Sequence, residues 1–332
     1  MNKSLTSHDH LFSVAPMMDW TDRHCRYFLR LITRRTRLYT EMITAPALAH
    51  GDVAYHLDFD ATEHPLALQL GGSDPGELAN AARLGERWGY DEINLNCGCP
   101  SERVQTGSFG ACLMGEPALV ADCVKAMRDA VAVPVTVKHR IGLDYNDDYS
   151  FVRDFVGTVA AAGCEVFIVH ARNAVLKGLS PKENREIPPL RYDVVHRLKR
   201  EFPALTIVVN GGLANWSAIT GELEHVDGAM VGRLAYHDPY TLATADWQVF
   251  GDDAPVRSRA EVVRALLPYV DAQSRRGVPV RAIARHILGL YHGQSGGRQF
   301  RRILSDSTRL KSAGSRILLE ALAAVDPRPL AA

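Results

Sequence analysis

The stretch TIVVNGGLANWSAITGELEHVDGAMVGR, residues 206–233, decides the fold. It begins with a β-rich apolar run that ends in Asn-Gly-Gly and continues through a segment that is typical of a helix. It closes on a second apolar run that ends in Gly-Arg. A strand, a helix and a second strand in this order predict a βαβ unit, whose two strands run parallel.

The same alternation extends over about 230 residues of the chain. Eight short apolar runs, each followed by a helix-like segment, occupy residues 12–17, 38–43, 66–72, 92–97, 134–140, 165–172, 206–212 and 228–233. The first clear helix has Asp74 as N-cap and Pro75 in its first turn, and it ends at Gly89. A doubly wound sheet would also alternate, but the strand count favours an α/β fold of the (β/α)8, or TIM-barrel, class.

The composition is that of a globular protein, because 46% of the 332 residues are hydrophobic and 23% are charged. No apolar run is long enough to cross a membrane, and the start of the chain lacks a signal-peptide pattern. We therefore expect a cytoplasmic protein with no membrane partner. The six cysteines have no disulfide-framework spacing, and no carboxylate–histidine cluster has metal-ligand spacing, so we expect no metal.

After residue 250 the pattern changes to helices alone, including one over residues 280–294. Residues 255–332 hold fourteen Lys and Arg against five acids, a net charge of +9, and the rest of the chain carries −9. Thirteen of these cations are Arg, which suits phosphate recognition. We therefore expect a barrel domain, 1–250, and a smaller all-helical domain, 251–332, that binds a polyanion. The alternative is a solvated helical surface that favours Arg.

Polar or glycine residues stand where each predicted strand ends, and in a barrel these ends share the face where active sites form. Residues 210–212 and 232–233 follow the last two strands. Barrels often bind phosphate there, because glycines expose backbone N–H groups and an Arg adds charge. The pair therefore predicts a cofactor or substrate with a phosphate.

The middle strands end in Gln69, Lys138 and His170. Amide and cationic donors suit a conjugated cofactor ring. Lys138 could instead form a Schiff base with pyridoxal phosphate, or an internal ion pair with Glu41. His170 could equally be a hydrogen-bonded core histidine.

Cys99 lies just past the fourth strand, between Gly98 and Pro100. Proline restricts the preceding residue to extended conformations, which would hold the thiol in one direction. A thiol is mostly protonated at neutral pH, so it can act as a general acid. The Gly-rich residues 106–115 predict a mobile lid, and we expect Cys97, still on the strand, to be a packing residue.

Several stretches of the chain resemble the tRNA-dihydrouridine synthases, most closely their A subfamily. They are SVAPMMDWTDRHCRYF, LYTEMIT, LALQLGG, EINLNCGCPSERVQTGSFGACLM, PVTVKHRIG, HARNAVLKGLSPKENREIPPL, NGG and MVGR. The match covers nearly the whole chain, and LNCGCPS with GACLM is highly specific to the family. The chain departs from close relatives at Cys97, where they usually have an apolar residue.

The resemblance implies an FMN enzyme that reduces uridines of the tRNA D-loop, at positions 20 and 20a, to 5,6-dihydrouridine. Reduced FMN would give a hydride to C6, Cys99 would protonate C5, and NADPH would re-reduce the flavin. The implied FMN-binding residues are Pro16, Met17, Met18, Gln69, Lys138, His170, Asn210, Gly211, Gly212, Gly232 and Arg233. The implied tRNA-binding residues are Asn96, Lys182, Arg185, Arg298 and Arg301.

Three other functions compete with this one. A flavin oxidoreductase acting on a free pyrimidine fits the barrel equally well but leaves the +9 tail without a role. A pyridoxal-phosphate barrel would use Lys138, and a non-enzymatic protein would only bind RNA. The sequence shows no separate dinucleotide domain for NADPH. We expect a monomer.

Overall fold

The computed structural model describes residues 10–101, 107–144 and 146–326. The chain divides into two compact units. The first consists of residues 1–18, 37–59 and 64–232, and the second of residues 19–36, 60–63 and 233–332. The domain boundary expected after residue 250 stays a prediction.

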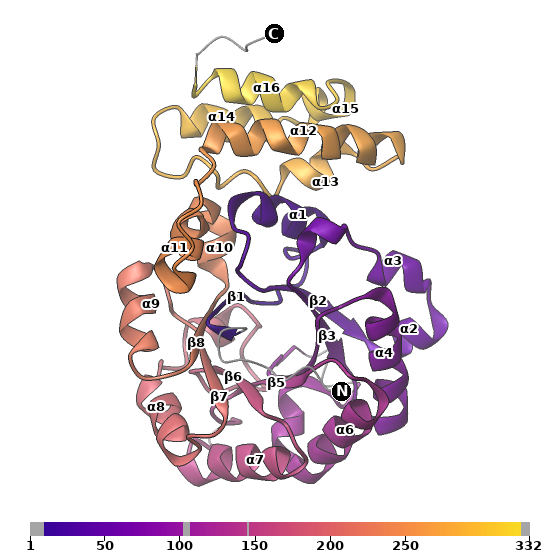
Figure 1. The fold of residues 1–332 in the computed structure, drawn as a ribbon, viewed down its shortest axis with the longest axis vertical. Coiled ribbons are helices and arrows are strands. Elements are labelled where there is room, and N and C mark those ends of the chain that lie inside the picture. Colours follow the sequence, from indigo (N-terminus) through magenta and orange to yellow (C-terminus); the bar gives the residue numbers. More distant parts are fainter. Residues whose placement is uncertain (1–9, 102–106, 145, 327–332) are drawn as a thin grey trace. The chain divides into compact units, whose positions relative to one another are not determined.

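The first unit is a barrel of eight parallel strands with helices around it, which confirms the predicted fold class (Figure 1). The strands are β1 (Phe12–Val14), β2 (Leu38–Thr44), β3 (Leu66–Gly71), β4 (Glu92–Cys97), β5 (Val135–Arg140), β6 (Val166–His170), β7 (Thr206–Asn210) and β8 (Gly228–Val231). They pair in sequence order, and β1 pairs with β8. The ring closes at Arg37, whose carbonyl accepts from the Val14 N–H at 2.9 Å and whose N–H donates to the Phe12 carbonyl at 3.2 Å.

Helices and short 3-10 turns connect the strands of the first unit. They are α2 (Ala45–His50), α3 (Val53–Leu57), α4 (Pro75–Trp88), η3 (Gly110–Gly115), α6 (Pro117–Ala130), α7 (Tyr149–Ala161), η4 (Glu183–Arg185), α8 (Tyr192–Glu201) and α9 (Trp216–Leu223). Helix α4 has the predicted ends: the Asp74 side chain accepts from the Glu77 N–H, and Gly89 ends the helix in the left-handed conformation. Both signals are local, which is why the sequence revealed them.

The barrel strands are buried on both faces, as parallel strands covered by helices are expected to be. All six residues of β3 and all six of β4 are buried. One apolar cluster contains Ala15, Tyr39, Ala67, Val166, Ile168, Val208 and Met230. This packing holds the strands of the barrel together and so positions their ends.

The described residues of the second unit form helices and no strand. The helices are α1 (Arg23–Ile32), η2 (Ala61–Glu63), α10 (Arg233–His237), η5 (Pro239–Thr244), α11 (Ala245–Phe250), α12 (Arg259–Arg275), α13 (Val280–Ala284), α14 (Gly297–Leu304), α15 (Ser307–Ser312) and α16 (Arg316–Ala323). A capping box between Ser258 and Glu261 starts α12. Within the described part of the chain, no helix is long and apolar enough to cross a membrane.

The helix expected over residues 280–294 is shorter in the structure, because α13 ends at Ala284. The backbone at Gly289 passes so close to the His237 carbonyl that a side chain there would collide with it. Tertiary packing therefore breaks a segment whose apolar spacing predicts a continuous helix.

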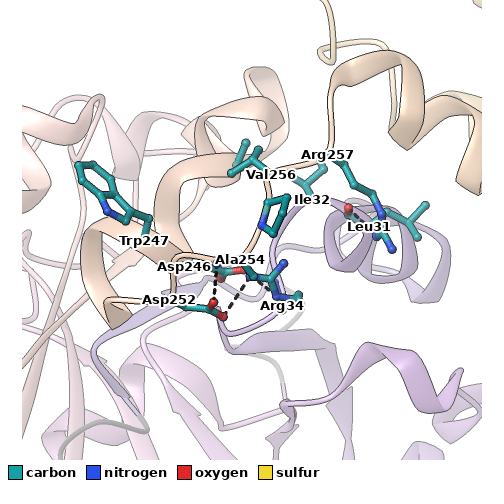
Figure 2. A pocket seen from close by; sticks show the side chains of 11 residues that line it. Leu31, Ile32, Arg34, Asp246, Trp247, Asp252, Ala254, Val256 and Arg257 are labelled. Atoms are coloured by element: carbon teal, nitrogen blue, oxygen red, sulfur yellow. Dashed lines mark hydrogen bonds and ion pairs between the residues drawn. The ribbon is translucent and has the colours of Figure 1, made fainter.

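A surface pocket of the second unit lies between the end of α1 and residues 243–257 (Figure 2). The Thr33 hydroxyl donates to Asp246 Oδ1 at 2.6 Å, and Arg34 donates to Asp252 Oδ2 at 3.0 Å. The carboxylates of the pocket are thus already engaged by neighbours in the same unit. These bonds hold α1 against α11 and the segment that follows it.

Candidate active site

The carboxyl end of β4 places two cysteines in different surroundings. Cys97 is the last residue of the strand and has no exposed surface, and burial raises the pKa of its thiol well above its ordinary value. Cys99 lies two residues further on and is partly exposed. The structure therefore agrees with a packing role for Cys97 and leaves Cys99 accessible to a reactant.

The backbone around Cys99 is held on both sides by hydrogen bonds. Asn96 Oδ1 accepts from the N–H groups of Gly98 and Cys99, at 3.0 Å each. The Ala111 N–H donates to the Cys99 carbonyl at 2.9 Å. The thiol itself lies 3.5 Å from the Ser101 hydroxyl. A side chain on such a fixed backbone has few directions open to it.

The segment that supplies Ala111 belongs to the stretch 106–115, whose mobility as a lid stays a prediction. Residues 110–115 form the 3-10 helix η3, and the side chains of Ala111, Leu113 and Met114 are buried. Three buried apolar side chains hold this half of the segment against the barrel. Thr106 lies outside the described residues.

Arg140, the last residue of β5, connects two loops at the barrel mouth. Its Nε donates to the Gly98 carbonyl at 3.0 Å. One terminal nitrogen donates to the carbonyls of Asn173 and Asn184, at 3.0 and 2.8 Å. Burial lowers its pKa to about 10. Our sequence analysis assigned Arg140 no role, although its position at the end of a strand was a signal.

Lys138 points into the mouth from β5, beside Asn96 in the strand register. Its Nζ donates to Asn210 Oδ1 at 3.1 Å. The alternative ion pair with Glu41 stays a prediction. Burial, together with the nearby charge of Arg140, lowers the pKa of this amine to about 7. The protonation state of Lys138 at neutral pH therefore depends on the charges of the groups that bind beside it.

His170 ends β6 and is a neutral ring in a positively charged neighbourhood. Burial, and then the charges of Arg140 and Lys138, lowers its pKa well below the ordinary histidine value. Among the described residues its buried Nδ1 has no hydrogen-bond partner. Buried polar atoms are normally satisfied, so this nitrogen indicates a missing bonding partner.

Gly211 and Gly212 follow β7 with positive φ angles of 107° and 70°. A Cβ at Gly211 would lie 3.1 Å from His170 Nε2. The preceding Asn210 donates from Nδ2 to the Met230 carbonyl at 2.8 Å, which ties the end of β7 to β8. Side chains are thus excluded from this turn, in which Gly211 is buried and Gly212 is exposed, so that a ligand can reach the backbone at Gly212.

The ends of β1 and β8 lie next to each other. A Cβ at Gly232 would come within 3.5 Å of Met17 Sδ, while Pro16 is partly buried and Met18 is 56% exposed. Arg233 is exposed and begins α10, in the second unit.

Gln69 lies deeper, on β3, with 1% of its surface exposed. Its Oε1 accepts from Asn96 Nδ2 at 2.8 Å, and its Nε2 donates to Asn94 Oδ1 at 2.7 Å. The structure thus brings Gln69 into direct contact with the residue that holds the Cys99 loop.

Comparison with known proteins identifies the family of this barrel. The dihydrouridine synthase family (Dus) matches residues 13–326. The chain belongs to this family. A tRNA-dihydrouridine(20/20a) synthase of Pseudomonas putida is 62% identical over 294 residues, 89% of this chain and 88% of that protein.

Proteins with the same name from other organisms are also similar. That of Xanthomonas campestris pv. campestris is 59% identical over 93% of this chain and 92% of its own length. That of Synechocystis is 58% identical over 94% of this chain and 93% of its own length. This dihydrouridine synthase is therefore an oxidoreductase of a tRNA-modifying family.

Two of the tRNA contacts that the family resemblance implies lie on the loop after β6. Lys182 and Arg185 are both exposed. Between them the buried Asn184 donates to the Val175 carbonyl at 2.8 Å and accepts from the Val175 N–H at the same distance. One buried amide thus holds the loop that presents two cations.

The other two cations lie on α14 in the second unit. Arg298 and Arg301 are exposed, one helical turn apart, while Phe300, Ile303 and Leu304 are buried. Helix α14 therefore presents a cationic face to solvent. Arg328, one of the fourteen cations counted in the tail, lies outside the described residues.

In the ranges that the structure describes, no group of three His, Cys, Asp or Glu side chains could hold a metal ion. The ligands that this dihydrouridine synthase offers are amides, cations, a neutral imidazole and backbone N–H groups. Such groups suit an organic cofactor with a phosphate better than a metal.

Proposed function

We propose that this chain reduces uridines 20 and 20a of the tRNA D-loop to 5,6-dihydrouridine with bound FMN. The similarity to proteins of that name, at 56–62% identity in the relatives compared, supports the proposal. One structural observation carries it: a partly exposed thiol, Cys99, sits on a backbone that is held by Asn96, and Asn96 is the strand neighbour of Lys138.

The barrel mouth fits FMN in two respects. His170 Nδ1 lacks a partner in the described protein, and Lys138 has used only one of its three N–H groups. Both can serve the acceptor atoms of a flavin ring. The exposed backbone of Gly212, next to the buried Gly211, suits its phosphate. The residues that we propose to bind FMN are Pro16, Met17, Met18, Gln69, Lys138, His170, Asn210, Gly211, Gly212, Gly232 and Arg233.

When bound, reduced FMN supplies a hydride to C6 of the uracil, and NADPH restores the reduced form. Cys99 donates its proton to C5, so that the C5=C6 bond gains two hydrogens. The thiolate left on Cys99 then takes up a proton from water. Lys138, with a pKa of about 7, becomes more basic beside negative charge and stabilises it.

The substrate must leave its base stack before it can reach such a mouth. We propose that Lys182, Arg185, Arg298 and Arg301 hold the tRNA backbone while the base is presented, and that Asn96 contacts the base. Asn96 Nδ2 donates one of its hydrogens to Gln69, and its other hydrogen can donate to the base. The monomeric state and the cytoplasmic location expected from the sequence stay predictions.

The decisive experiment incubates the purified protein with NADPH and tRNA from a strain that lacks the modification, then maps dihydrouridine by mass spectrometry. We expect dihydrouridine at positions 20 and 20a with the wild type, none with Cys99→Ala, and near-normal amounts with Cys97→Ala. Binding of tRNA by Cys99→Ala should remain. Full activity of Cys99→Ala would refute the acid assignment.

The same preparation separates the alternatives. Reduction of free uracil without reduction of tRNA would instead establish a small-molecule oxidoreductase. Release of a pyridoxal aldehyde rather than FMN on denaturation would establish a Schiff-base enzyme, and tRNA binding without any product would leave an RNA-binding protein.

A further inference from the structure

The barrel interior contains a continuous chain of polar side chains that leads from the Cys99 loop to a deep ion pair. Its members come from β3, β4 and β5, and none has more than 9% of its surface exposed. They are Glu92, Thr136, Asn94, Gln69 and Asn96.

At the deep end of this chain of side chains, the donors and acceptors can be arranged in one direction only. Glu92 Oε2 lies 3.4 Å from Arg37 Nε, and Glu92 Oε1 accepts from the Thr136 hydroxyl at 2.6 Å. A carboxylate paired with arginine accepts hydrogen bonds and does not donate them. Thr136 therefore donates its hydroxyl hydrogen to Glu92, and its hydroxyl oxygen accepts from Asn94 Nδ2 at 2.8 Å.

That direction passes from amide to amide across the strands. With its Nδ2 turned to Thr136, Asn94 offers Oδ1 to Gln69 Nε2, at 2.7 Å. Gln69 then offers Oε1 to Asn96 Nδ2, at 2.8 Å. Asn96 is left with Oδ1 for the two backbone N–H groups of the Cys99 loop.

The mouth end requires the same direction independently, because backbone N–H groups can only donate. Both ends therefore agree, and every amide between them has one orientation that satisfies its neighbours. Reversing a single amide would set donor against donor on one side and acceptor against acceptor on the other. Such a buried network is stable only when it is fully satisfied.

We infer that Thr136 and Asn94 are positioning residues for the reaction: they fix the orientation of Gln69 and Asn96, and through Asn96 the direction of the Cys99 thiol. Thr136 has no exposed surface and lies two positions before Lys138 on β5, so it acts through the chain rather than by contact with a reactant. The inference rests on the proposed role of Cys99 as the acid.

Two substitutions at Thr136 separate hydrogen bonding from packing. Thr136→Val keeps the shape but can neither accept from Asn94 nor donate to Glu92. Thr136→Ser keeps the hydroxyl and loses a methyl group. If the hydrogen bonds of the polar chain position Cys99, Thr136→Val slows the reaction more. If only the packing of the side chain matters, Thr136→Ser slows it more.

Tyr39→Phe supplies a matched control. The Tyr39 hydroxyl donates to the same Glu92 oxygen at 2.7 Å but is not a member of the polar chain that leads to Asn96. Losing it perturbs the deep ion pair without reorienting any amide. We expect Tyr39→Phe to lower stability and to leave turnover near the wild-type rate.

The first readout is the single-turnover oxidation of reduced, FMN-loaded enzyme by saturating tRNA. We expect Thr136→Val to slow it about tenfold or more, as a displaced acid would. Thr136→Ser should stay within about threefold of the wild type, and the tRNA affinity of both variants should be unchanged. A wild-type rate for Thr136→Val would overturn the inference. So would a rate for Thr136→Ser or Tyr39→Phe as low as that of Thr136→Val.

The second readout does not depend on the reaction. Iodoacetamide alkylation of Cys99, followed by peptide mass spectrometry of the folded protein, reports the direction and surroundings of the thiol. The alkylation rate should change in Thr136→Val and not in Thr136→Ser, and equal rates in all variants would refute the inference. If the wild type fails to reduce tRNA, the proposed function is wrong, and the alkylation rates still decide the positioning role.

Discussion

Replacing Lys138 by methionine should make the FMN-free protein more stable at neutral pH, although it removes the charge for which we propose a role in the reaction. The pKa of the buried amine falls from 10.5 to about 7 in the folded protein. Each tenfold change in acidity is worth about 1.36 kcal/mol. Protonated Lys138 therefore costs the folded state about 5 kcal/mol relative to the unfolded chain at acidic pH, and slightly less at pH 7.

The sign of the pH dependence follows from proton counting. Between pH 7 and 10.5 the unfolded chain binds more protons at Lys138 than the folded chain does, so this residue makes stability rise with pH. Below pH 7 both states are protonated and the cost is constant. In Lys138→Met the contribution disappears, so the stability advantage of the variant should grow by about 3.5 kcal/mol from pH 10 to pH 7.

Urea unfolding of FMN-free protein, followed by circular dichroism at several pH values, measures this difference. The contributions of the other titrating groups to the free energy of unfolding cancel in this difference, because both proteins contain them. Lys125→Met is the control, since Lys125 lies on α6 with 66% of its side chain exposed and should show no such trend. A difference between Lys138→Met and the wild type that is the same at pH 7 and pH 10 would show that the amine is not desolvated.

Two further predictions concern the ligands. Gly211→Ala should weaken FMN binding at least about tenfold, because the new Cβ meets His170 and a positive φ strains the turn. Gly178→Ala has a similar φ of 90° and no neighbour within 4 Å, so flavin fluorescence should report unchanged FMN affinity there, and equal weakening would contradict the steric argument. Arg301→Ala should lower tRNA affinity and reduce the salt dependence of binding by about one counterion, measured by titration at several salt concentrations. Arg301→Lys should keep that slope, and an unchanged slope in Arg301→Ala would remove this residue from the tRNA contacts.

The sequence revealed those features of the barrel that local signals determine. The eight strands appear as short apolar runs, and α4 carries its N-cap and its terminal glycine within sixteen residues. Cys99 and Lys138 stand out because they follow or end a strand. Such positions can be recognised from the residues next to them in the sequence.

The remaining features depend on strand register. Asn94 meets Thr136 and Gln69 only because β4 pairs in that register with β5 and β3. A lone polar residue inside an apolar run was a visible signal, but its partner lies 42 or 25 residues away. For the same reason Arg140 could not be recognised as the residue that connects two loops.

The loop between β6 and α8 has a consequence for redesign. Its shape is maintained partly from within, since Asn184 bonds to the backbone at Val175, Leu179 and Ser180. It is also held from outside, because Arg140 donates to the carbonyls of Asn173 and Asn184, and Asp144 accepts from the Leu176 N–H. The segment can therefore be exchanged only in a barrel that keeps Arg140 and Asp144. Replacing this segment as a whole, with Asn184 included and with Arg140, Asp144 and Cys99 unchanged, is therefore a rational way to exchange Lys182 and Arg185 together.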